Sequence, residues 1–586
     1  MQSTETVLGV LRERGRRGLP VERLYRQLFN PQWYLLAYGK LYSNRGALTP
    51  GADGETVDGM ALAKIDRIID ALRHERYRFK PVKRVYIPKK NGKRRPLGLP
   101  TWADKLVGEV VRMLLQAYYE PAFSPHSHGF RPGRGCHTAL REVANTWKGT
   151  AWFVEGDIAR CFDALDHRVM AETLGEKIHD NRFLRLLRNM LQAGYLEDWR
   201  YHETPSGVPQ GGVVSPILSN VYLSRLDTFV ETVLIPEYTR GTTRVINPEY
   251  SRTSQAIGAA KRRGDRAKVR TLRKRQRSLP SKDPQDPSYR RLRYIRYADD
   301  VLFGFAGPKV EAEDIKQRLA TFLRDDLKLE LSQAKTLVTH GRTSAARFLG
   351  YEITVQHNDT RITQGQRSVN SAIGLRVPLD VIRTKCAQYK KRGKPAPRPH
   401  LINEDDYTII GTYGAEYRGI VGYYPMALDI GRFTRLHWVM QTSLLKTLAG
   451  KYHSTVVKMS RKYMTAIDTP YGPRKCLEAR IDRGEGRKPL IARFGGIPLK
   501  RQKYTVLTDR APTPTLPGRK ELVTRLLSNR CEICNNTDDI QTHHVRKLAD
   551  LDRVEEPRPT WVQVMIKRRR KALVVCRTCH DQIHAR

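Results

Sequence analysis

The chain has 586 residues, 40% of them hydrophobic, so it is long enough for three or four domains that each bury a core. It carries 105 Lys and Arg against 60 Asp and Glu, and its formal net charge of +45 indicates a nucleic-acid partner without separating an enzyme from a passive binder. Residues 1–20 lack a signal-like apolar core, and no apolar run approaches roughly 18 residues, so we expect no secretion and no membrane contact. The expected compartment is the cytoplasm, in a bacterium and associated with the nucleoid.

Helical and mixed regions follow one another along the chain. Residues 1–78 read as helical, with an apolar and aromatic stretch over 24–42. Strand-like and helical patterns over 79–365 predict an α+β domain. Residues 366–460 read as a basic helical domain. Residues 461–525 mix Gly, Pro and basic residues and predict a DNA-contacting module and linker.

Two acid-bearing strands stand far apart within the α+β region. Residues 152–157 read as a strand that ends at Asp157, and 292–305 read as a hairpin with Asp299 and Asp300 at its tip. Phosphoryl transfer is catalysed by two divalent ions about 4 Å apart, and hard ions such as Mg²⁺ prefer oxygen ligands. If the strands lie side by side, these three aspartates hold two Mg²⁺ ions and the chain is a nucleic-acid polymerase.

A basic segment interrupts the α+β region. Residues 251–296 hold 16 Lys or Arg and only 3 Asp, and the periodicity of 255–279 predicts helices. This charge exceeds what a solvated helix face needs, so we interpret 235–290 as an RNA-binding helical insertion. A helix pair that is merely soluble is the alternative.

The last segment, 526–586, contains a second set of chemically active side chains. Two Cys-x-x-Cys pairs form a tetrathiolate set suited to structural zinc, namely Cys531, Cys534, Cys576 and Cys579. His543 and His544 lie between the pairs. His580 and His584 follow the last cysteine and are four residues apart, so they share one face of a helix.

Motifs in a fixed order resemble those of the reverse transcriptase-maturases encoded by group II introns, including members with a C-terminal HNH endonuclease domain. The matching strings are Phe79–Lys89, Gly92–Pro100, His128–Gly135, Gly207–Pro216, Ser332–Thr336 and Arg347–Tyr351. The resemblance implies a right-hand polymerase whose fingers and palm span 79–365, after an N-terminal extension over 1–78. It implies a helical thumb or maturase domain over 366–460 and a small zinc-stabilised ββα-metal HNH domain over 526–586.

The resemblance also assigns roles within the polymerase. The residues implied to bind the incoming dNTP are Lys89, Arg94, Arg95, Phe162 and Gln210. Phe162 would exclude a 2′-hydroxyl, and Lys335 would protonate the departing pyrophosphate. The alternatives are a solvated basic loop for the three cations, an ordinary core position for Phe162 and an ordinary surface position for Lys335.

In the HNH pattern, one divalent ion polarises the scissile phosphate while an imidazole activates water. The resemblance implies that His544 is this general base and that His543, His580 and His584 approach the Mg²⁺ or Mn²⁺ ion. The middle asparagine of the pattern is not evident, since Lys571-Ala572 stands where it is expected. A zinc-stabilised DNA-binding knuckle is one alternative, and a zinc site completed by His580 instead of a cysteine is another.

Together these features imply a multifunctional enzyme of intron mobility. It would bind its own group II intron RNA and promote splicing, nick target DNA, and copy the RNA template from the DNA primer with dNTPs. A splicing-only maturase without polymerase activity is the first alternative. Another retroelement or defence-associated reverse transcriptase is the second.

Overall fold

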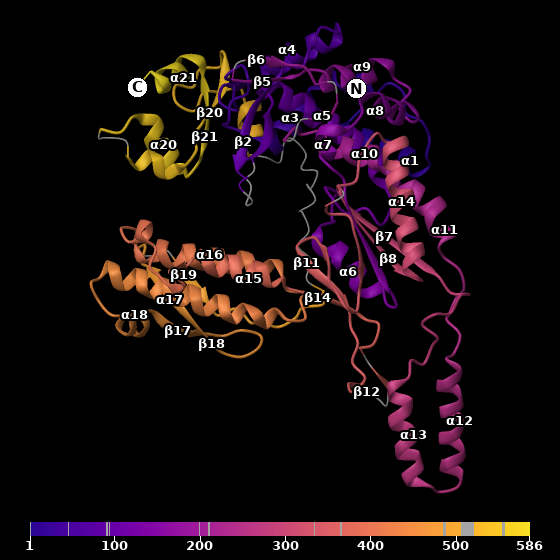
Figure 1. The fold of residues 1–586 in the computed structure, drawn as a ribbon. Coiled ribbons are helices and arrows are strands. Elements are labelled where there is room, and N and C mark those ends of the chain that lie inside the picture. The colour runs from indigo at the N-terminus through magenta and orange to yellow at the C-terminus, as the bar shows by residue number, and fades with distance from the viewer. Residues whose placement is uncertain are drawn as a thin grey trace.

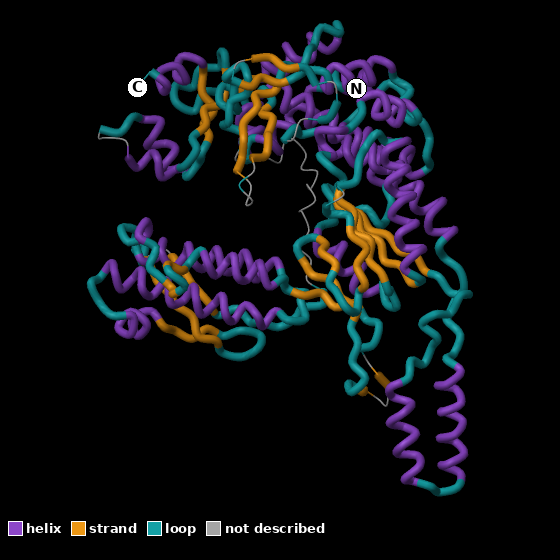
Figure 2. The backbone as a smooth tube through the Cα atoms, viewed as in Figure 1, coloured by secondary structure: helices purple, strands orange, loops and turns teal. Residues whose placement is uncertain are grey.

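The computed structural model describes residues 2–44, 46–88, 92, 94–198, 200–204, 206–208, 211–332, 334–363, 366–367, 369–484, 488–504, 521–553 and 557–585. The strands gather into several separate sheets joined by helical segments (Figure 2). Figure 1 shows the C-terminal elements beside the N-terminal helices, although they stand at opposite ends of the chain. Among the described helices, none combines the length and the apolar character needed to cross a membrane.

Residues 1–78 are mainly helical. The elements are α1 (Thr4–Arg16), α2 (Leu24–Gln27), α3 (Pro31–Leu41), the short strand β1 (Met60–Ala61) and α4 (Leu62–Arg73). The side chain of Asn30 caps α3 by accepting from the backbone N–H of Gln32, and Pro31 occupies the first turn, where it costs no hydrogen bond. Trp33, Tyr34 and Tyr38 of α3 are fully buried, so this helix is a core element rather than a surface one.

A second region surrounds the sheet of order β3-β2-β5-β6. Its strands are β2 (Val82–Pro88), β3 (Arg94–Leu99), β5 (Tyr195–Glu197) and β6 (Arg200–His202). Its helices are α5 (Trp102–Tyr119), α6 (Cys136–Thr146), α7 (Cys161–Ala164), α8 (His167–Gly175), α9 (Asn181–Leu191), α10 (Ser215–Phe229) and α11 (Ile235–Glu237). The β2–β3 hairpin is antiparallel and pairs Ile87 with Arg95.

The central sheet has the order β7-β8-β4-β9, and every neighbouring pair is antiparallel. Its strands are β4 (Trp152–Asp157), β7 (Arg291–Tyr297), β8 (Asp300–Ala306) and β9 (Leu337–His340). Val301 and Phe303 enter one hydrophobic core, whereas Leu302 between them enters the other. This alternation follows from the two-residue period of a strand, so the sheet is covered on both faces. The helix α14 (Lys309–Asp325) packs on the first face, against β4.

The basic segment forms two helices that pack against each other and project from the central sheet (Figure 1). These are α12 (Pro248–Arg262) and α13 (Arg266–Ser278), separated by a turn at Gly264, whose φ is +72°. No residue of α13 is buried, and its Lys and Arg side chains are all exposed to solvent.

A helical body follows the small sheet of β10 (Ala346–Phe348), β11 (Tyr351–Val355) and β14 (Ile373–Arg376). Its helices are α15 (Leu379–Ala387), α16 (Asp406–Tyr423), α17 (Phe433–Lys451) and α18 (Val456–Tyr463). The sheet of β17 (Met464–Ile467), β18 (Arg474–Ile481) and β19 (Leu490–Gly495) packs on α16. Gly414 on α16 approaches the carbonyl oxygen of Arg493 so closely that a Cβ would lie 2.0 Å from it. Residues 464–495, expected to belong to a DNA-contacting module and linker, therefore share the core of the preceding helices.

The C-terminal region is a ββα unit joined to the N-terminal region. It consists of α19 (Glu521–Leu527), β20 (Ile540–His544), α20 (Thr560–Arg568), β21 (Ala572–Cys576) and α21 (Arg577–His584). β20 pairs with β21 on one edge and with β1 on the other, where Met60 faces Thr542. The C-terminal sheet is thus completed by an N-terminal strand.

The turn between β7 and β8 is anchored by a buried ion pair. Arg296 is fully buried, and its guanidinium donates to both carboxylate oxygens of Asp227 on α10, at 2.8 and 2.6 Å. The same side chain donates to the carbonyl oxygen of Ala298 at 3.0 Å and to Oδ1 of Asn220 at 3.1 Å. Burial alone would lower the pKa of Arg296, but Asp227 outweighs it and raises the pKa above its usual value. The turn is therefore fixed to α10 by a charged group that remains ionised.

Replacing Arg296 with alanine leaves Asp227 as an unpaired buried charge, so the variant should lose about 3–5 kcal/mol of stability. The matched control is Arg324→Ala, since Arg324 pairs with Asp325 on the exposed surface of α14. Thermal unfolding of the full chain measures both. A melting temperature for Arg296→Ala equal to that of the control would show that the buried pair does not hold the turn.

Candidate active sites

Three aspartates meet at one end of the β4–β8 pair. The register places Asp157 opposite Asp300, so their Cβ atoms lie about 5 Å apart. Ala298 and Asp299 form the two-residue turn between β7 and β8, and Ala298 has φ +55°. A non-glycine residue in this region is uncommon and fits a tight hairpin turn. The predicted arrangement of adjacent acid-bearing strands is present, while metal binding by the three aspartates stays a prediction.

The turn is also packed from outside. The backbone N–H of His128 donates to the carbonyl oxygen of Arg296 at 2.9 Å, and Asn220 donates to that of Gly129 at 2.9 Å. A Cβ at Gly129 would lie 2.3 Å from the backbone nitrogen of Ala298. Only glycine lets the segment after His128 approach the turn this closely, which explains the residue type in physical terms.

Electrostatics at this end of the sheet are dominated by like charges. Burial, followed by the charges of Asp299 and Asp157, raises the pKa of Asp300 to about 6. Burial and the charge of Asp157 also raise the pKa of Asp299. Among the described residues, the three carboxylates do not form a group whose oxygens all lie within 4.8 Å of one another. Like charges repel one another, so the ionised forms of neighbouring carboxylates are disfavoured. Cations bound here would stabilise the ionised forms of the three aspartates.

Lys335 supplies one positive charge at the aspartates. Its Nζ donates to Oδ2 of Asp157 at 2.8 Å, and this contact is the main reason why the pKa of Lys335 is raised. The side chain is 66% exposed, so it can move away from the carboxylate. It therefore lies next to the aspartates, and its proposed role as a proton donor requires it to leave Asp157.

The residues implied to bind a dNTP are only partly described. Lys89 and Gln210 lie outside the described residues. Arg94 and Arg95 begin β3, where both are exposed. The charge of Arg95 opposes the rise that burial causes in the pKa of Asp299, so this side chain influences the aspartate site.

Phe162 lies in the short helix α7, next to the aspartate-bearing strand. It is only half-buried, and its ring meets that of Phe130 edge to face, with centroids 6.2 Å apart. It also packs against the main hydrophobic core, so a core position and a role at the aspartates both stay open. Its carbonyl oxygen accepts from the backbone N–H of Val208, which ties α7 to the loop before α10.

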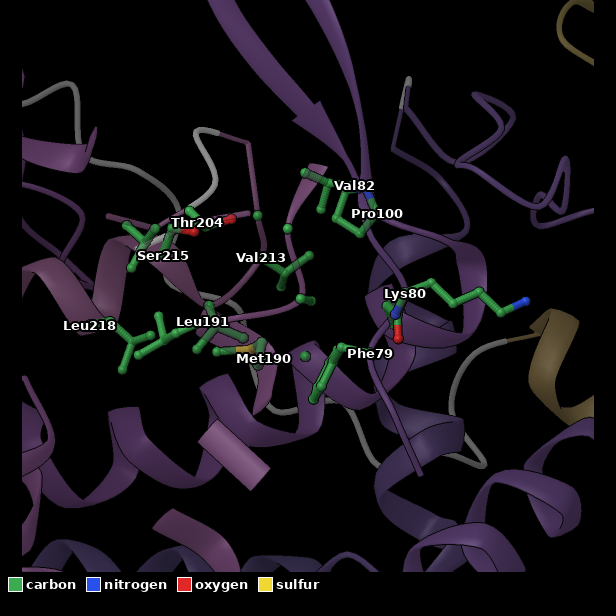
Figure 3. A pocket seen from close by; sticks show the side chains of 17 residues that line it. Phe79, Lys80, Val82, Pro100, Met190, Leu191, Thr204, Val213, Ser215 and Leu218 are labelled. Carbon is green, nitrogen blue, oxygen red and sulfur yellow. The ribbon is translucent and has the colours of Figure 1, made fainter. Parts of the chain in front are cut away.

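An apolar pocket lies behind that loop (Figure 3). Its lining includes Phe79, Met190, Leu191, Val213 and Leu218, contributed by four separate segments. The lining also includes Lys80, whose Nζ pairs with Oδ2 of Asp53 at 3.1 Å, and the carboxylate of Asp104, so the pocket is a poor match for a triphosphate. A neighbouring hollow includes Arg84 and Arg160 beside the carboxylates of Asp163 and Glu203, so it offers two guanidinium groups that the first pocket lacks.

The four predicted cysteines come together. The Sγ atoms of Cys531, Cys534, Cys576 and Cys579 all lie within 4.8 Å of one another. Burial would raise the pKa of the Cys531 thiol, but the backbone N–H groups of Cys534, Cys576 and Ile533 outweigh it and lower the pKa to about 7. Such N–H groups stabilise a thiolate, the form that binds metal. The donors suit zinc, and no histidine is needed to complete the set.

The predicted histidines divide between two environments. His543, His580 and His584 gather within 4.8 Å around a carboxylate that the sequence did not indicate, that of Asp58. His544 points to the other face of β20, where its Nε2 is 3.1 Å from the hydroxyl of Tyr38 on α3. Burial lowers the pKa of His544 to about 4, so its imidazole is neutral at pH 7.

Sequence reasoning missed two groups of residues. The Arg296–Asp227 pair lies beneath a recognised motif, but an arginine in a strand and an aspartate in a helix give no local signal. Asp58 is separated from His584 by 526 residues, and no spacing rule connects them. Only the pairing of β1 with β20 brings it to the histidines.

Family models match three parts of the chain. Residues 87–247 match the reverse transcriptase (RNA-dependent DNA polymerase) model, 377–472 the type II intron maturase model, and 531–580 the AI2M/AI1M-like HNH endonuclease model. The resemblance stated from the sequence motifs is thus confirmed, and it extends through all three domains.

Two of three similar proteins align with almost the whole chain. Group II intron-encoded protein LtrA of Lactococcus lactis subsp. cremoris is 38% identical and covers 96% of this chain and 95% of its own length. The 91 kDa protein in cob intron of Schizosaccharomyces pombe is 34% identical over 95% of this chain and 69% of its own. Protein YkfC of Escherichia coli is 32% identical over 57% of this chain and 84% of its own. The chain belongs to the family of group II intron-encoded proteins, with reverse transcriptase, maturase and HNH endonuclease domains.

Proposed function

We propose that the aspartates at the end of β4 and β8 are the catalytic centre of the reverse transcriptase. The observation that carries this proposal is the register that sets Asp157 opposite Asp300, next to Asp299. Two Mg²⁺ ions, when bound, supply the Lewis acidity and the charge that phosphoryl transfer needs. The central sheet is then the palm, and the β2–β3 hairpin belongs to the fingers.

Side chains around the aspartates orient the substrates. Arg94 and Arg95, with Lys89, grip the triphosphate, because guanidinium groups match phosphate oxygens in two-point contacts. Phe162 excludes a 2′-hydroxyl, and Gln210, which lies outside the described residues, belongs to the same dNTP-binding set. Lys335 donates a proton to the departing pyrophosphate once it has left Asp157.

The helical body forms the thumb and contacts RNA through sugar and phosphate groups, since the grooves of A-form duplexes resist base readout. The helices α12 and α13 form a second RNA-binding surface, and the RNA that binds it is the intron RNA. Support comes from the exposed cations of α13, because none of its residues is buried. The protein acts in the cytoplasm, where it stabilises folded intron RNA and promotes its splicing.

The C-terminal unit nicks one strand of target DNA. The four cysteines would hold a structural zinc ion, and His543, His580 and His584 would hold a divalent ion, which would supply the charge that polarises a scissile phosphate. His544 is the general base. The hydroxyl of Tyr38 donates to Oγ1 of Thr542 at 3.1 Å, so it accepts from Nε2 of His544 and leaves Nδ1 unprotonated, the form that a general base needs.

A splicing-only maturase is the second candidate function. In such a protein we expect a palm that has lost one of the three aspartates or the contacts that hold the turn. Here all three aspartates are present, and the turn is anchored by Arg296. The geometry therefore favours an active polymerase, whose 3′-hydroxyl primer is the nicked DNA strand.

Asp299→Ala should reduce primer extension on an annealed RNA template and DNA primer by at least about 10³-fold, because transition-state charge loses several kcal/mol of stabilisation. Its affinity for intron RNA should change little. Asp326→Ala, on the exposed end of α14, is the control and should extend normally. Extension by Asp299→Ala at the rate of this control would refute the catalytic assignment.

Arg266, Arg270 and Lys274 are exposed and lie along one face of α13. Replacing all three with glutamine should reduce the slope of log K against log salt for intron RNA by up to about 2, if each neutralises one phosphate. The control is a second triple variant, in which Lys309 and Arg324 on α14 and Lys328 after it, all exposed, are replaced with glutamine. Equal slopes for the two triple variants would show that α12 and α13 make no RNA contact.

Cys531→Ser should remove most of the zinc that copurifies with the chain, because a closed tetrathiolate site needs all four donors. Elemental analysis should find about one zinc per chain in the wild type and in Cys136→Ser, whose cysteine lies outside the set. A Cys531→Ser protein with undiminished zinc would contradict this proposal.

A further inference from the structure

The strongest feature outside the assigned residues is the contact of Asp58 with the nuclease histidines. Oδ2 of Asp58 lies 2.8 Å from Nε2 of His584 and 3.3 Å from Nε2 of His580, and Oδ1 lies 3.5 Å from Nδ1 of His543. Donor atoms around a four-coordinate ion with bonds of about 2.1 Å are about 3.4 Å apart. The four side chains therefore already have the spacing of a ligand set.

Buried nitrogen atoms in this set lack other partners. His543 is 4% exposed, and neither of its ring nitrogens makes a hydrogen bond to any described residue. Nε2 of His580 is also buried without a hydrogen-bond partner among those residues. Buried polar atoms of this kind are costly unless a ligand binds them. His584 is 53% exposed, so one side of the set opens to solvent and to a phosphate.

Asp58 is held in place by the backbone of the nuclease strand. The N–H of His544 donates to Oδ1 of Asp58 at 2.7 Å, and the N–H of Gly59 donates to the carbonyl oxygen of Thr542 at 2.9 Å. These bonds lie just before the pairing of Met60 with Thr542. One carboxylate oxygen is thus fixed by a backbone N–H while the other faces the imidazoles, which is how ligating carboxylates are usually oriented.

The same N-terminal region reaches the second face of β20. Tyr38 on α3 contacts His544, and Thr542 donates in turn to the carbonyl oxygen of Met60 at 3.4 Å. In the HNH pattern an asparagine within the domain supports the loop that bears the base, and this chain has Lys571-Ala572 there. In this chain α3 and β1 contact β20, the strand that bears His544, from outside the ββα unit.

We propose that the N-terminal segment completes the nuclease: Asp58 is the fourth protein ligand of the divalent ion, together with His543, His580 and His584. The inference rests on the proposed nuclease function of the C-terminal unit and adds a ligand from another domain. It follows that the ion ties the N-terminal region to the ββα unit, so nicking depends on their docking.

The proposal is tested by measuring nitrogen hyperfine coupling to Mn²⁺ bound by the full chain. This coupling identifies ions held by histidine, because the proposed ligands in the palm are oxygen atoms and give none. Asp58→Asn keeps an oxygen that can accept from the His544 N–H but removes the charge. It should weaken the nitrogen-coupled Mn²⁺ site by about tenfold or more. Glu55→Gln, three residues away and paired with Lys64, is the matched control and should bind like the wild type.

An affinity of Asp58→Asn within about twofold of the control would overturn the proposal. Tighter binding or faster nicking would also overturn it, since Asp58 would then be a group that blocks the site. A wild type without nitrogen-coupled Mn²⁺ would exclude the composite site altogether.

Hydrogen exchange of the wild type provides a test that needs no variant. If Asp58 binds the ion, Mn²⁺ should slow amide exchange over residues 57–61, because the ion ties this segment to α21. Unchanged exchange there would contradict the proposal, even if Asp58→Asn failed to fold.

The nuclease function is tested separately by nicking of target DNA. His544→Ala should abolish nicking while leaving nitrogen-coupled Mn²⁺ binding intact. A wild type that binds Mn²⁺ through Asp58 but never nicks DNA would refute the nuclease function and leave the composite metal site standing.

Discussion

The register of β4 against β8 is the constraint on which the polymerase depends. It brings Asp157 opposite Asp300, and the short turn adds Asp299, so three like charges are placed where they repel one another. A chain without compensating contacts would relieve this repulsion by moving the turn. The contacts that offset this repulsion come from Arg296, which joins the turn to Asp227 and Asn220 of α10. The core and the proposed catalytic centre are therefore parts of one hydrogen-bonded unit.

The C-terminal candidate site also depends on contacts from outside its own elements, here from the other end of the chain. The ββα unit does not form a closed domain, because β1 extends its sheet and Asp58 faces its histidines. The hydrogen bonds from Tyr38 and the backbone of β20 fix the position of these groups. The two ends of the chain thus pack together, and a cut between them would separate Asp58 from the histidines that it contacts.

Local patterns predicted the groups that lie on single elements. The strand ending at Asp157, the hairpin bearing Asp299 and Asp300, and the two cysteine pairs were all visible, because their chemistry is carried by spacing along the chain. The Asp227 and Asp58 contacts were not predictable, since each depends on packing between segments that share no sequence pattern. The same limit applies to the segment 464–495. Its Gly and Pro residues suggested a linker, but its strands form a sheet that buries Leu477 and Phe494 in the core of the preceding helices.

The central claim is that Asp157, Asp299 and Asp300 hold a pair of ions at the primer end. Crystals of the full chain with an RNA template, a DNA primer, a non-hydrolysable dNTP and Mn²⁺ would show the ions by anomalous scattering. The account predicts two peaks about 4 Å apart, bridging these carboxylates and the triphosphate. A bound dNTP with no anomalous peak within bonding distance of Asp157 and Asp300 would contradict it.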